Sequence, residues 1–490
     1  MIVGVAGAGT MGAGIAATAR DAGLRVLLHD PDPAARDRVE GVEWAAEPGG
    51  LAPCDVVIEA APEVLEVKRA LFAALAEAVA PDAVLATNTS SLLVSAVAAG
   101  VPGPERVVGL HFFNPVPRMR LVELVAGAES GADALARARA LGEALGKHVI
   151  EAADGPGFLV NRCNRPFSLE PLRIVQERLA TPEQVDRICR RALGFRMGPF
   201  ELMDLVGVDV GYAIARSFHE QTAEPRWRPS PLAARMAASG RHGRKTGRGW
   251  YAYPPGRPPD PDPPAPGGGD GLVVIAGEEP IAAVLLDEAA AAGWDAATPE
   301  EAEGELPHLI VDCGATDEGP PLQGGPQLLL CDAAPLAAQD PGGTAAGFVL
   351  AAPLLDGAPA ELTRGPSTSP AAAAAAERFF ATLGRGAEWV GDAPGLISGR
   401  ILAMLVNEAC FALGEGAGSA ADVDAGMQLG LNHPRGPLAW GDLVGPGAVL
   451  ETLLALGEEY REERYRPAPA LVRAVRAETA LADGVLPWGG

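Results

Sequence analysis

Short apolar runs alternate with amphipathic stretches along the first 150 residues, a pattern that predicts a doubly wound α/β domain. The runs with the length of buried parallel strands are residues 2–6, 25–30, 55–60 and 83–86. Apolar residues at helical spacing follow the first run, and a second helix is expected over residues 65–79. Because such sheets bind ligands at the carboxyl ends of their strands, polar residues at those ends are the first candidates for chemistry.

The first strand runs into the sequence Gly-x-Gly-x-x-Gly, within which a helical pattern begins. Gly7 permits a tight turn, Gly9 lets the backbone approach a pyrophosphate, and Gly12 allows close packing of helix on strand. Free N–H groups at the helix start favour phosphate. Asp30, at the end of the second strand, would bind the ribose hydroxyls and repel a 2′-phosphate, which favours NAD over NADP. The residues expected to contact the dinucleotide here are Gly7, Gly9, Thr10, Met11, Gly12 and Asp30.

A histidine and a glutamate stand in two successive apolar runs farther along the same domain. His111 starts an apolar-aromatic run, and Glu123 follows twelve residues later. An imidazole with a pKa near neutrality is the usual base for an alcohol proton, and a carboxylate on a neighbouring strand could hold its other nitrogen. On these residues alone, a structural pair and a catalytic pair both stay open.

Further polar residues follow two of the predicted strands. Glu63 and Lys68 come after the strand at 55–60, and the tetrad 88–91 comes after the strand at 83–86. A charged helix start and a solvated lysine would account for the first pair without any function. A helix N-cap explains one hydroxyl of the tetrad but leaves its other polar groups unexplained.

Length and composition narrow the classes of function. A chain of 490 residues predicts about three or four domains. The net charge of −24 argues against nucleic acid or an anionic membrane surface as partner. Six scattered cysteines predict neither a disulfide framework nor a zinc site, so no metal is expected. With no basic leader and no apolar run of membrane-spanning length, a cytoplasmic protein is expected.

The second half of the chain repeats part of the first. From residue 153 the apolar spacing is helical, and a Pro/Gly-rich linker follows at 255–270. A shift of 238 residues aligns 155–207 with 393–445 without a gap, giving 14 identities in 53 positions. A second helical domain is therefore predicted, in which Gly399 takes the place of Asn161.

Six motifs, all within residues 1–254, resemble those of the L-3-hydroxyacyl-CoA dehydrogenase family and occur in the family's order. They are Asn88-Thr89-Ser90-Ser91-Leu92, Gly109-Leu110-His111-Phe112-Phe113-Asn114-Pro115-Val116-Pro117, Leu121-Val122-Glu123, Gly155-Pro156-Gly157-Phe158-Leu159-Val160-Asn161-Arg162, Met197-Gly198-Pro199-Phe200-Glu201-Leu202-Met203-Asp204 and Gly243-Arg244-Lys245-Thr246-Gly247-Arg248-Gly249-Trp250-Tyr251.

This resemblance implies a role for each matching residue. His111 would take the proton of the 3-hydroxyl while hydride passes to NAD, and Glu123 would orient His111. Ser90 and Asn161 would hydrogen-bond the reacting oxygen. The matching positions near the cofactor are Glu63, Lys68, Asn88, Asn114 and Lys245.

The resemblance over residues 1–254 and the apolar runs, linker and repeat of the remaining residues together predict the architecture. An NAD-binding Rossmann domain (1–152) would be followed by an all-α C-terminal domain (153–254), the linker (255–270), a degenerate Rossmann-like domain without cofactor (271–390) and a second all-α copy (391–490). Two-domain members pair through their helical domains, so the second copy would supply that pairing within the chain, with a homodimer as an alternative.

One segment departs from the family pattern. A long helical hairpin that contacts the CoA nucleotide usually follows the second strand, but here only 24 residues separate Asp30 from Asp55, with room for one short helix near 33–40. Weaker or rearranged CoA binding is one interpretation. A different acyl carrier or a free hydroxy acid is the other.

The leading hypothesis is NAD-dependent oxidation of an L-3-hydroxyacyl-CoA to the 3-oxoacyl-CoA, as in fatty-acid β-oxidation. Duplicated long forms resemble the enzymes of phenylacetate-type degradation, which implies a short or dicarboxylic acyl chain. A dehydrogenase of free 3-hydroxy acids and a non-catalytic NAD-binding or scaffold protein are the alternatives.

Overall fold

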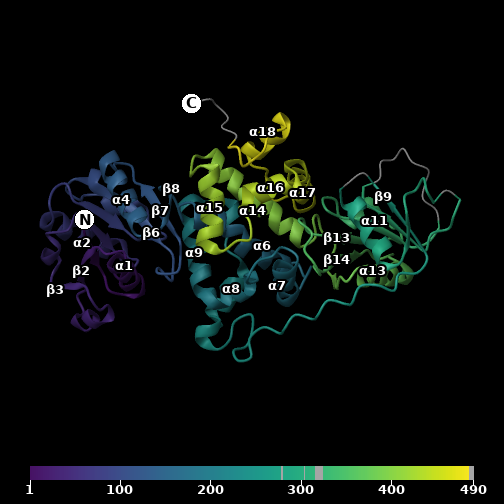
Figure 1. Ribbon diagram of the computed structural model, residues 1–490, viewed down its shortest axis with the longest axis horizontal. Coiled ribbons are helices and arrows are strands. Elements are labelled where there is room, and N and C mark those ends of the chain that lie inside the picture. Colours follow the sequence, from purple (N-terminus) through teal and green to yellow (C-terminus); the bar gives the residue numbers. More distant parts are fainter. Residues whose placement is uncertain (278–279, 303, 315–323, 485–490) are drawn as a thin grey trace.

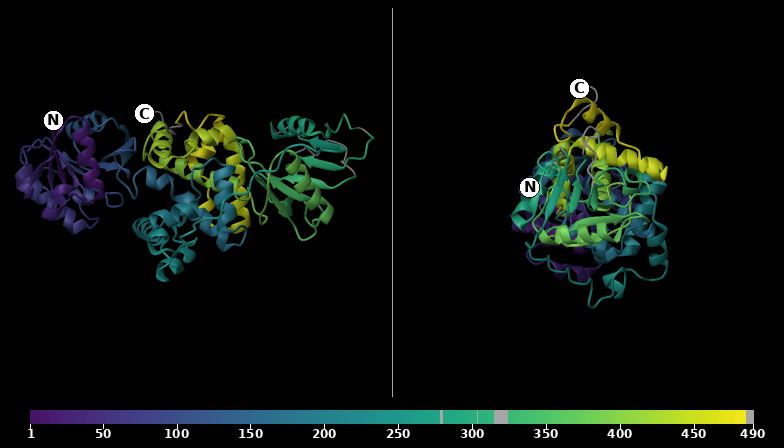
Figure 2. Two further views of the ribbon diagram at one scale, coloured as in Figure 1. Left: turned by 60° about the horizontal axis from the view of Figure 1, so that its bottom comes forward. Right: turned by 90° about the vertical axis from the view of Figure 1, so that its right-hand side faces the viewer.

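The computed structural model describes residues 1–277, 280–302, 304–314 and 324–484. An α/β unit at the N-terminus and a second α/β unit lie at opposite ends of an elongated molecule, with helices from both halves of the chain between them (Figure 1). The same three-part division is visible after rotation, whereas the view along the long axis superimposes the parts (Figure 2).

The N-terminal sheet confirms the predicted Rossmann-type fold. Its eight strands have the order β3-β2-β1-β4-β5-β6-β7-β8, and all neighbours are parallel except β6 and β7. The strands are β1 (Ile2–Ala6), β2 (Arg25–His29), β3 (Glu43–Ala45), β4 (Val56–Glu59), β5 (Val84–Thr87), β6 (Val107–Phe112), β7 (Leu121–Ala126) and β8 (His148–Ala153). The helices are α1 (Thr10–Asp21), α2 (Leu65–Ala78), α3 (Val94–Ala98) and α4 (Ala132–Ala144).

The segment between β2 and β4 contains no long helical hairpin, as its length predicted. It forms a short 3₁₀ helix, η1 (Pro33–Arg38), the edge strand β3 and a second 3₁₀ turn, η2 (Pro48–Leu51). Proline begins both 3₁₀ helices, and the Asp32 side chain accepts from the Ala34 N–H to cap the first.

Two helical units occupy the middle of the molecule. The first contains α5 (Val160–Cys163), α6 (Arg165–Gln176), α7 (Pro182–Arg191), α8 (Pro199–Val206), α9 (Val208–Thr222) and α10 (Pro231–Ala238). The second contains α14 (Ser398–Gly414), α15 (Ala420–Leu431), α16 (Pro437–Val444), α17 (Pro446–Tyr460) and α18 (Pro469–Ala477). The stretch at 257–271 has neither helix nor strand and runs as an extended trace toward the second α/β unit (Figure 1).

Among the described residues, the second sheet repeats the topology of the first without a counterpart of β3. Its order is β10-β9-β11-β12-β13-β14-β15, with β13 and β14 antiparallel. The strands are β9 (Leu272–Ala276), β10 (Asp295–Ala297), β11 (Leu309–Asp312), β12 (Gln327–Leu330), β13 (Ala346–Val349), β14 (Ala360–Arg364) and β15 (Ala387–Trp389), and the helices are α11 (Pro280–Ala292), α12 (Leu336–Gln339) and α13 (Pro370–Thr382). The predicted Rossmann-like second domain is therefore confirmed. The loop between β9 and α11, where a glycine fingerprint would lie, includes residues 278–279, outside the described residues.

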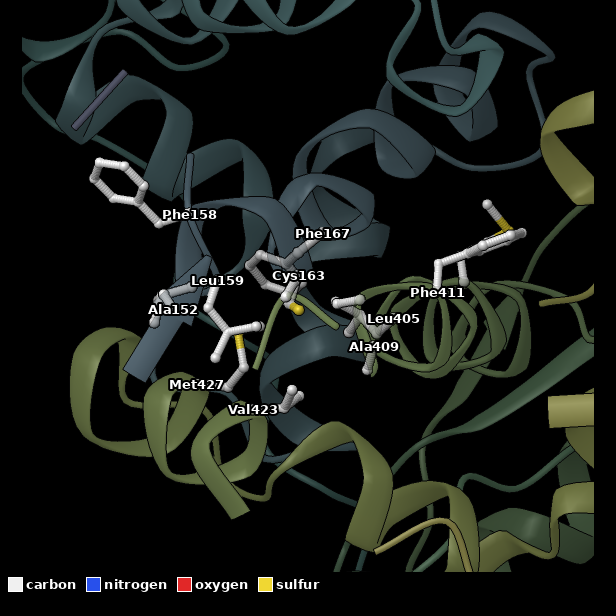
Figure 3. Packing of buried hydrophobic residues seen from close by; sticks show 14 of the residues in the cluster. Ala152, Phe158, Leu159, Cys163, Phe167, Leu405, Ala409, Phe411, Val423 and Met427 are labelled. Carbon is white, nitrogen blue, oxygen red and sulfur yellow. The ribbon is translucent and has the colours of Figure 1, made fainter. Parts of the chain in front are cut away.

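The two helical units pack against each other through equivalent residues. Nε of Arg162 lies 3.0 Å from Glu408, and Nε of Arg400 lies 2.7 Å from Glu170. Each pair becomes the other under the shift of 238 residues. Apolar side chains from both units fill the space between them, among them Phe158, Leu159, Phe167, Leu405, Ala409 and Met427 (Figure 3). The predicted pairing within the chain is thus present.

Candidate active site

His111 and Glu123 form the centre of the site because the antiparallel register of β6 and β7 places them opposite each other. Nδ1 of His111 lies 2.6 Å from Oε2 of Glu123. The carboxylate is fully buried and the imidazole nearly so. With Nδ1 held by the carboxylate, Nε2 is the ring nitrogen that remains to exchange a proton with a ligand.

Glu123 also connects the sheet to the first helical unit. Its Oε1 accepts the backbone N–H groups of Leu159 (3.1 Å) and Val160 (2.9 Å), at the start of α5. Those N–H groups have no partner within the helix, so the carboxylate satisfies them while holding the imidazole. Asn161 follows directly on α5, and its position relative to His111 is therefore set by one carboxylate.

The turn before α5 is held in an unusual conformation. Gly157 has φ +69°, and a Cβ there would lie 2.2 Å from the Phe218 ring. The next residue, Phe158, has φ +51°, and its ring centroid lies 5.9 Å from that of His111. Phe113 covers the imidazole at 4.6 Å between centroids. Aromatic side chains therefore exclude water from much of the imidazole surface.

Glu63 organises the loop that carries Ser90. Its Oε1 accepts the Thr89 hydroxyl at 2.5 Å and the backbone N–H groups of Ser90 and Ser91 at 3.0 Å. Burial pushes the pKa of Glu63 upward, but the Thr89 hydroxyl, the charge of Lys68 and the serine donors outweigh burial, so its pKa is lowered and it is ionised. Ser90 is exposed, and β5 adjoins β6, so its loop and His111 share one sheet edge.

Lys68 is buried, with 1% of its surface exposed, and is not a solvated lysine. Its ammonium lies 2.6 Å from Glu59 and 3.2 Å from Glu63. Glu59 also accepts the Thr87 hydroxyl at 2.7 Å. The lysine thus links the end of β4 to the Ser90 loop. Glu59 was missed by sequence reasoning; its only signal is an acidic residue ending a buried strand.

Asn88 and Asn114 flank the histidine at the sheet edge. Oδ1 of Asn88 accepts the N–H of Phe112 at 2.8 Å, which fixes the end of β6 beside His111. Asn114 is exposed in the following loop and precedes a cis proline, Pro115.

The glycine loop leaves room for a dinucleotide. A Cβ at Gly12 would lie 1.8 Å from the Gly7 carbonyl oxygen, so close packing of α1 on β1 requires glycine. A Cβ at Gly9 would meet nothing within 4 Å, so the space beside the helix N-terminus is open. Asp30 stands at the end of β2, where its side chain accepts the Ala8 and Asp32 N–H groups. Thr10 and Met11, the first two residues of α1, complete a cradle that fits NAD.

The ion pair of Lys245 is with Asp209, which is not one of the predicted site residues. Lys245 belongs to the short 3₁₀ helix η5 (Arg244–Thr246) of the first helical unit, and its ammonium lies 2.7 Å from Asp209 at the start of α9. The lysine is 46% exposed on its side chain, so it is accessible to a ligand.

The second half retains part of the same arrangement. Glu361, which is Glu123 plus 238, accepts the N–H groups of Ile397 and Ser398 at the start of α14. The residue opposite it in the β13–β14 register is Val349, where the first half has His111. A cavity of about 370 Å³ lies beside Val349 and Gly399. At the positions equivalent to His111 and Asn161 the second half therefore has Val349 and Gly399, while Glu361 keeps the carboxylate that anchors the helix.

The described parts of the chain contain neither a cluster of metal-ligating side chains nor a helix that could span a membrane. Residues 1–277, 280–302, 304–314 and 324–484 contain no group of three or more His, Cys, Asp or Glu side chains able to hold a metal ion. Within these same ranges, every helix is too short or too polar to cross a lipid bilayer.

Comparison with known proteins gives matches for both halves. The family model for the NAD binding domain of 3-hydroxyacyl-CoA dehydrogenase matches residues 2–48 and 36–155. The model for the C-terminal domain of 3-hydroxyacyl-CoA dehydrogenase matches twice, at 157–253 and 395–483, which confirms the predicted duplication.

Individual relatives extend over the whole chain or over its first half. The 3-hydroxyadipyl-CoA dehydrogenase of Escherichia coli K12 is 36% identical over 96% of both chains. A 3-hydroxybutyryl-CoA dehydrogenase of Mycobacterium tuberculosis is 40% identical, covering 51% of this chain and 98% of its own. The crystal structure of a 3-hydroxybutyryl-CoA dehydrogenase from Escherichia coli K12 superposes with a TM-score of 0.81, at 32% identity and 98% coverage of both chains.

Proposed function

Because this chain belongs to the 3-hydroxyacyl-CoA dehydrogenase family, and so oxidises 3-hydroxyacyl-CoA esters with NAD, we propose that His111 is the general base of the reaction. The observation that carries the proposal is the buried 2.6 Å contact between Nδ1 of His111 and Glu123. Nε2 takes the proton of the 3-hydroxyl, and the Glu123 carboxylate stabilises the imidazolium that forms. NAD, when bound, supplies a hydride acceptor for the carbinol carbon.

Ser90 and Asn161 are the groups that bind the reacting oxygen. Ser90 stands in the loop at the sheet edge shared with His111, and Asn161 follows the two N–H groups that Glu123 accepts. Hydrogen bonds from the hydroxyl and the amide strengthen as that oxygen becomes a carbonyl. Both donors are held by carboxylates that also serve other members of the site, Glu63 for Ser90 and Glu123 for Asn161.

The residues that would hold NAD occupy two regions. The glycine loop with Thr10 and Met11 receives the pyrophosphate, and Asp30 binds the adenosine ribose. The residues at the nicotinamide end are Glu63, Lys68, Asn88, Asn114 and Lys245. Lys68 acts here as a positioning residue, because its buried ammonium binds Glu59 and Glu63.

The acyl chain that we propose is short and ends in a second carboxylate. The support is the Escherichia coli relative named 3-hydroxyadipyl-CoA dehydrogenase, which matches both halves of this chain. A cytoplasmic location fits the six cysteines, all of which are buried and none of which is in a disulfide among the described residues.

Oxidation of NADH with acetoacetyl-CoA, measured beside free acetoacetate, tests the carrier. We expect turnover with the thioester and at least about a hundredfold lower kcat/KM with the free acid, since CoA contributes binding energy that the acid lacks. Equal rates with both would favour a free hydroxy-acid dehydrogenase. NAD binding without turnover of either compound would contradict the enzymatic function.

A further inference from the structure

A pocket of about 190 Å³ lies in the first helical unit beside Asn161. Residues of α5, α6, α8, α9 and α10 surround it together with Leu431 of α15, and its lining is mostly aliphatic. Arg165 is the one charged side chain among the described residues that line it; Ser168, Tyr212 and Ser230 add hydroxyl groups. An aliphatic pocket with one cation suits a short carbon chain that ends in an anion.

Arg165 is 93% buried, yet it has no carboxylate partner among the described residues. Its Nε donates to the Asn161 carbonyl oxygen at 2.9 Å, and its guanidinium lies 5.4 Å from the Phe218 ring centroid. Burial lowers the pKa of this guanidinium to about 10. A buried charge is costly unless an opposite charge or several hydrogen bonds compensate for it.

In other buried arginines of the helical core, the positive charge is compensated by a glutamate. Arg162 and Arg226 both bind the buried Glu408, and Arg400 binds Glu170 and Glu177. Arg165 is about as buried as Arg162 and Arg226 and differs from them in lining a pocket instead of pairing with a glutamate. The partner that it lacks is therefore expected to come from a ligand.

The position of Arg165 also fits the geometry of the substrate. Asn161 on α5 and Arg165 at the start of α6 both line this pocket, and the Arg165 Nε donates to the Asn161 carbonyl oxygen. Asn161 binds the reacting oxygen in the proposed mechanism. A second carboxylate three bonds beyond the carbinol carbon stays close enough to the reacting oxygen for both groups to be bound at one pocket of this size. In the second half of the chain, the equivalent of Arg165 is Ala403, which lines the cavity beside Gly399.

We propose that Arg165 binds a carboxylate at the far end of the acyl chain, which makes the enzyme selective for dicarboxylic 3-hydroxyacyl thioesters. This assignment rests on the proposed function of His111 and Asn161, and it names the residue that selects among substrates of that reaction. The guanidinium offers its two terminal nitrogens to the two carboxylate oxygens, a geometry that an ammonium cannot reproduce.

Selectivity is tested with two thioesters of equal chain length, 3-hydroxyadipyl-CoA and 3-hydroxyhexanoyl-CoA. The wild-type enzyme should have the higher kcat/KM for the dicarboxylic compound. In Arg165→Met this ratio should fall by about ten- to a hundredfold, the value of a hydrogen bond to a charged group. Arg165→Lys should retain part of this selectivity ratio, because the ammonium keeps the positive charge but cannot form two parallel hydrogen bonds to the carboxylate. The matched control is Arg235→Met, an exposed arginine on α10 that should leave the ratio unchanged.

The outcomes separate the substrate assignment from the reaction itself. If wild type turns over both thioesters with equal kcat/KM, or if Arg165→Met loses equal activity on both, Arg165 does not bind the carboxylate, while the dehydrogenase function stands. If wild type oxidises neither thioester, the proposed function fails. Far-ultraviolet circular dichroism and the melting temperature establish whether the variants fold, and an unfolded Arg165→Met leaves the decision to Arg165→Lys and to the wild-type ratio.

Discussion

At the residue scale, Glu123 connects the base to the helix that carries Asn161. Both of its oxygens are occupied, one by Nδ1 of His111 and the other by two backbone N–H groups. Both oxygens of a carboxylate accept hydrogen bonds. The amide of glutamine, which has a similar size, accepts only at its oxygen and donates at its nitrogen.

Replacing Glu123 by glutamine tests this double role. The amide oxygen of Glu123→Gln is expected to face the Leu159 and Val160 N–H groups, which leaves the NH₂ group facing Nδ1. The imidazole then carries its proton on Nε2 and cannot act as a base, so kcat should fall by roughly 10²–10⁴. Steady-state kinetics with 3-hydroxybutyryl-CoA measures the effect. A variant with near-normal kcat would remove Glu123 from the mechanism.

Sequence reasoning identified the pair but could not identify all of its neighbours. His111 and Glu123 stand in apolar runs where a polar residue needs a reason to be buried, and the family motifs indicated their roles. Glu59 and Arg165 gave no comparable signal. Their importance depends on which partner they face. The Glu59 carboxylate meets Lys68, whereas the Arg165 guanidinium meets no carboxylate among the described residues, and only the folded chain decides this.

At the scale of elements, an antiparallel pair follows the parallel strands in both halves of the chain. Strands β6 and β7 place His111 opposite Glu123, and β13 and β14 place Val349 opposite Glu361. In the second half the carboxylate still accepts the N–H groups at a helix start. There it anchors the helix without a histidine to bind.

The pH dependence of stability tests the state of Glu361. Complete burial raises its pKa from 4.5 to about 7, although N–H donors at the helix start partly oppose that effect. Between pH 4.5 and pH 7 this carboxyl group is ionised in the unfolded state but still protonated in the folded state. The free energy of unfolding therefore falls as the pH rises from 4.5 to 7. Glu361→Gln should remove that loss, and its stability relative to wild type should rise by as much as about 3 kcal/mol across the window. Urea unfolding at pH 5 and pH 8 measures it, and parallel behaviour of the two proteins would refute the assignment.

Helices and strands were predictable where the pattern of apolar residues was long and periodic. The strands β1, β2, β4 and β5 and the helix α2 lie where apolar spacing placed them. Strand β3 was missed, since three residues between proline- and glycine-rich segments carry no periodic signal. The shift of 238 residues also reaches Glu361, but its surrounding strands have diverged too far for the alignment to show it.

At the scale of the molecule, the two helical units pack against each other within one chain. Phe167, Leu405 and Met427 lie in one cluster that spans both units (Figure 3). The reciprocal pairs of Arg162 with Glu408 and of Arg400 with Glu170 leave a buried glutamate or arginine unpaired if either unit is removed.

A fragment ending at residue 254 tests this dependence. It exposes the face of α6 that packs on α14, so two copies are expected to associate through that face and sediment with twice the fragment mass. In such a dimer Arg162 of one copy would meet Glu170 of the other. A stable, soluble monomer of the fragment would show that the first helical unit does not need its counterpart.

The reaction is tested most directly at His111. In His111→Ala, oxidation of NADH with acetoacetyl-CoA should fall by roughly 10²–10⁴, the usual contribution of a general base, with the affinity for NAD unchanged. His148→Ala, at an exposed position on β8, serves as the matched control and should keep the wild-type rate. A His111→Ala enzyme that works at a near-normal rate would contradict the assignment of His111 as the base.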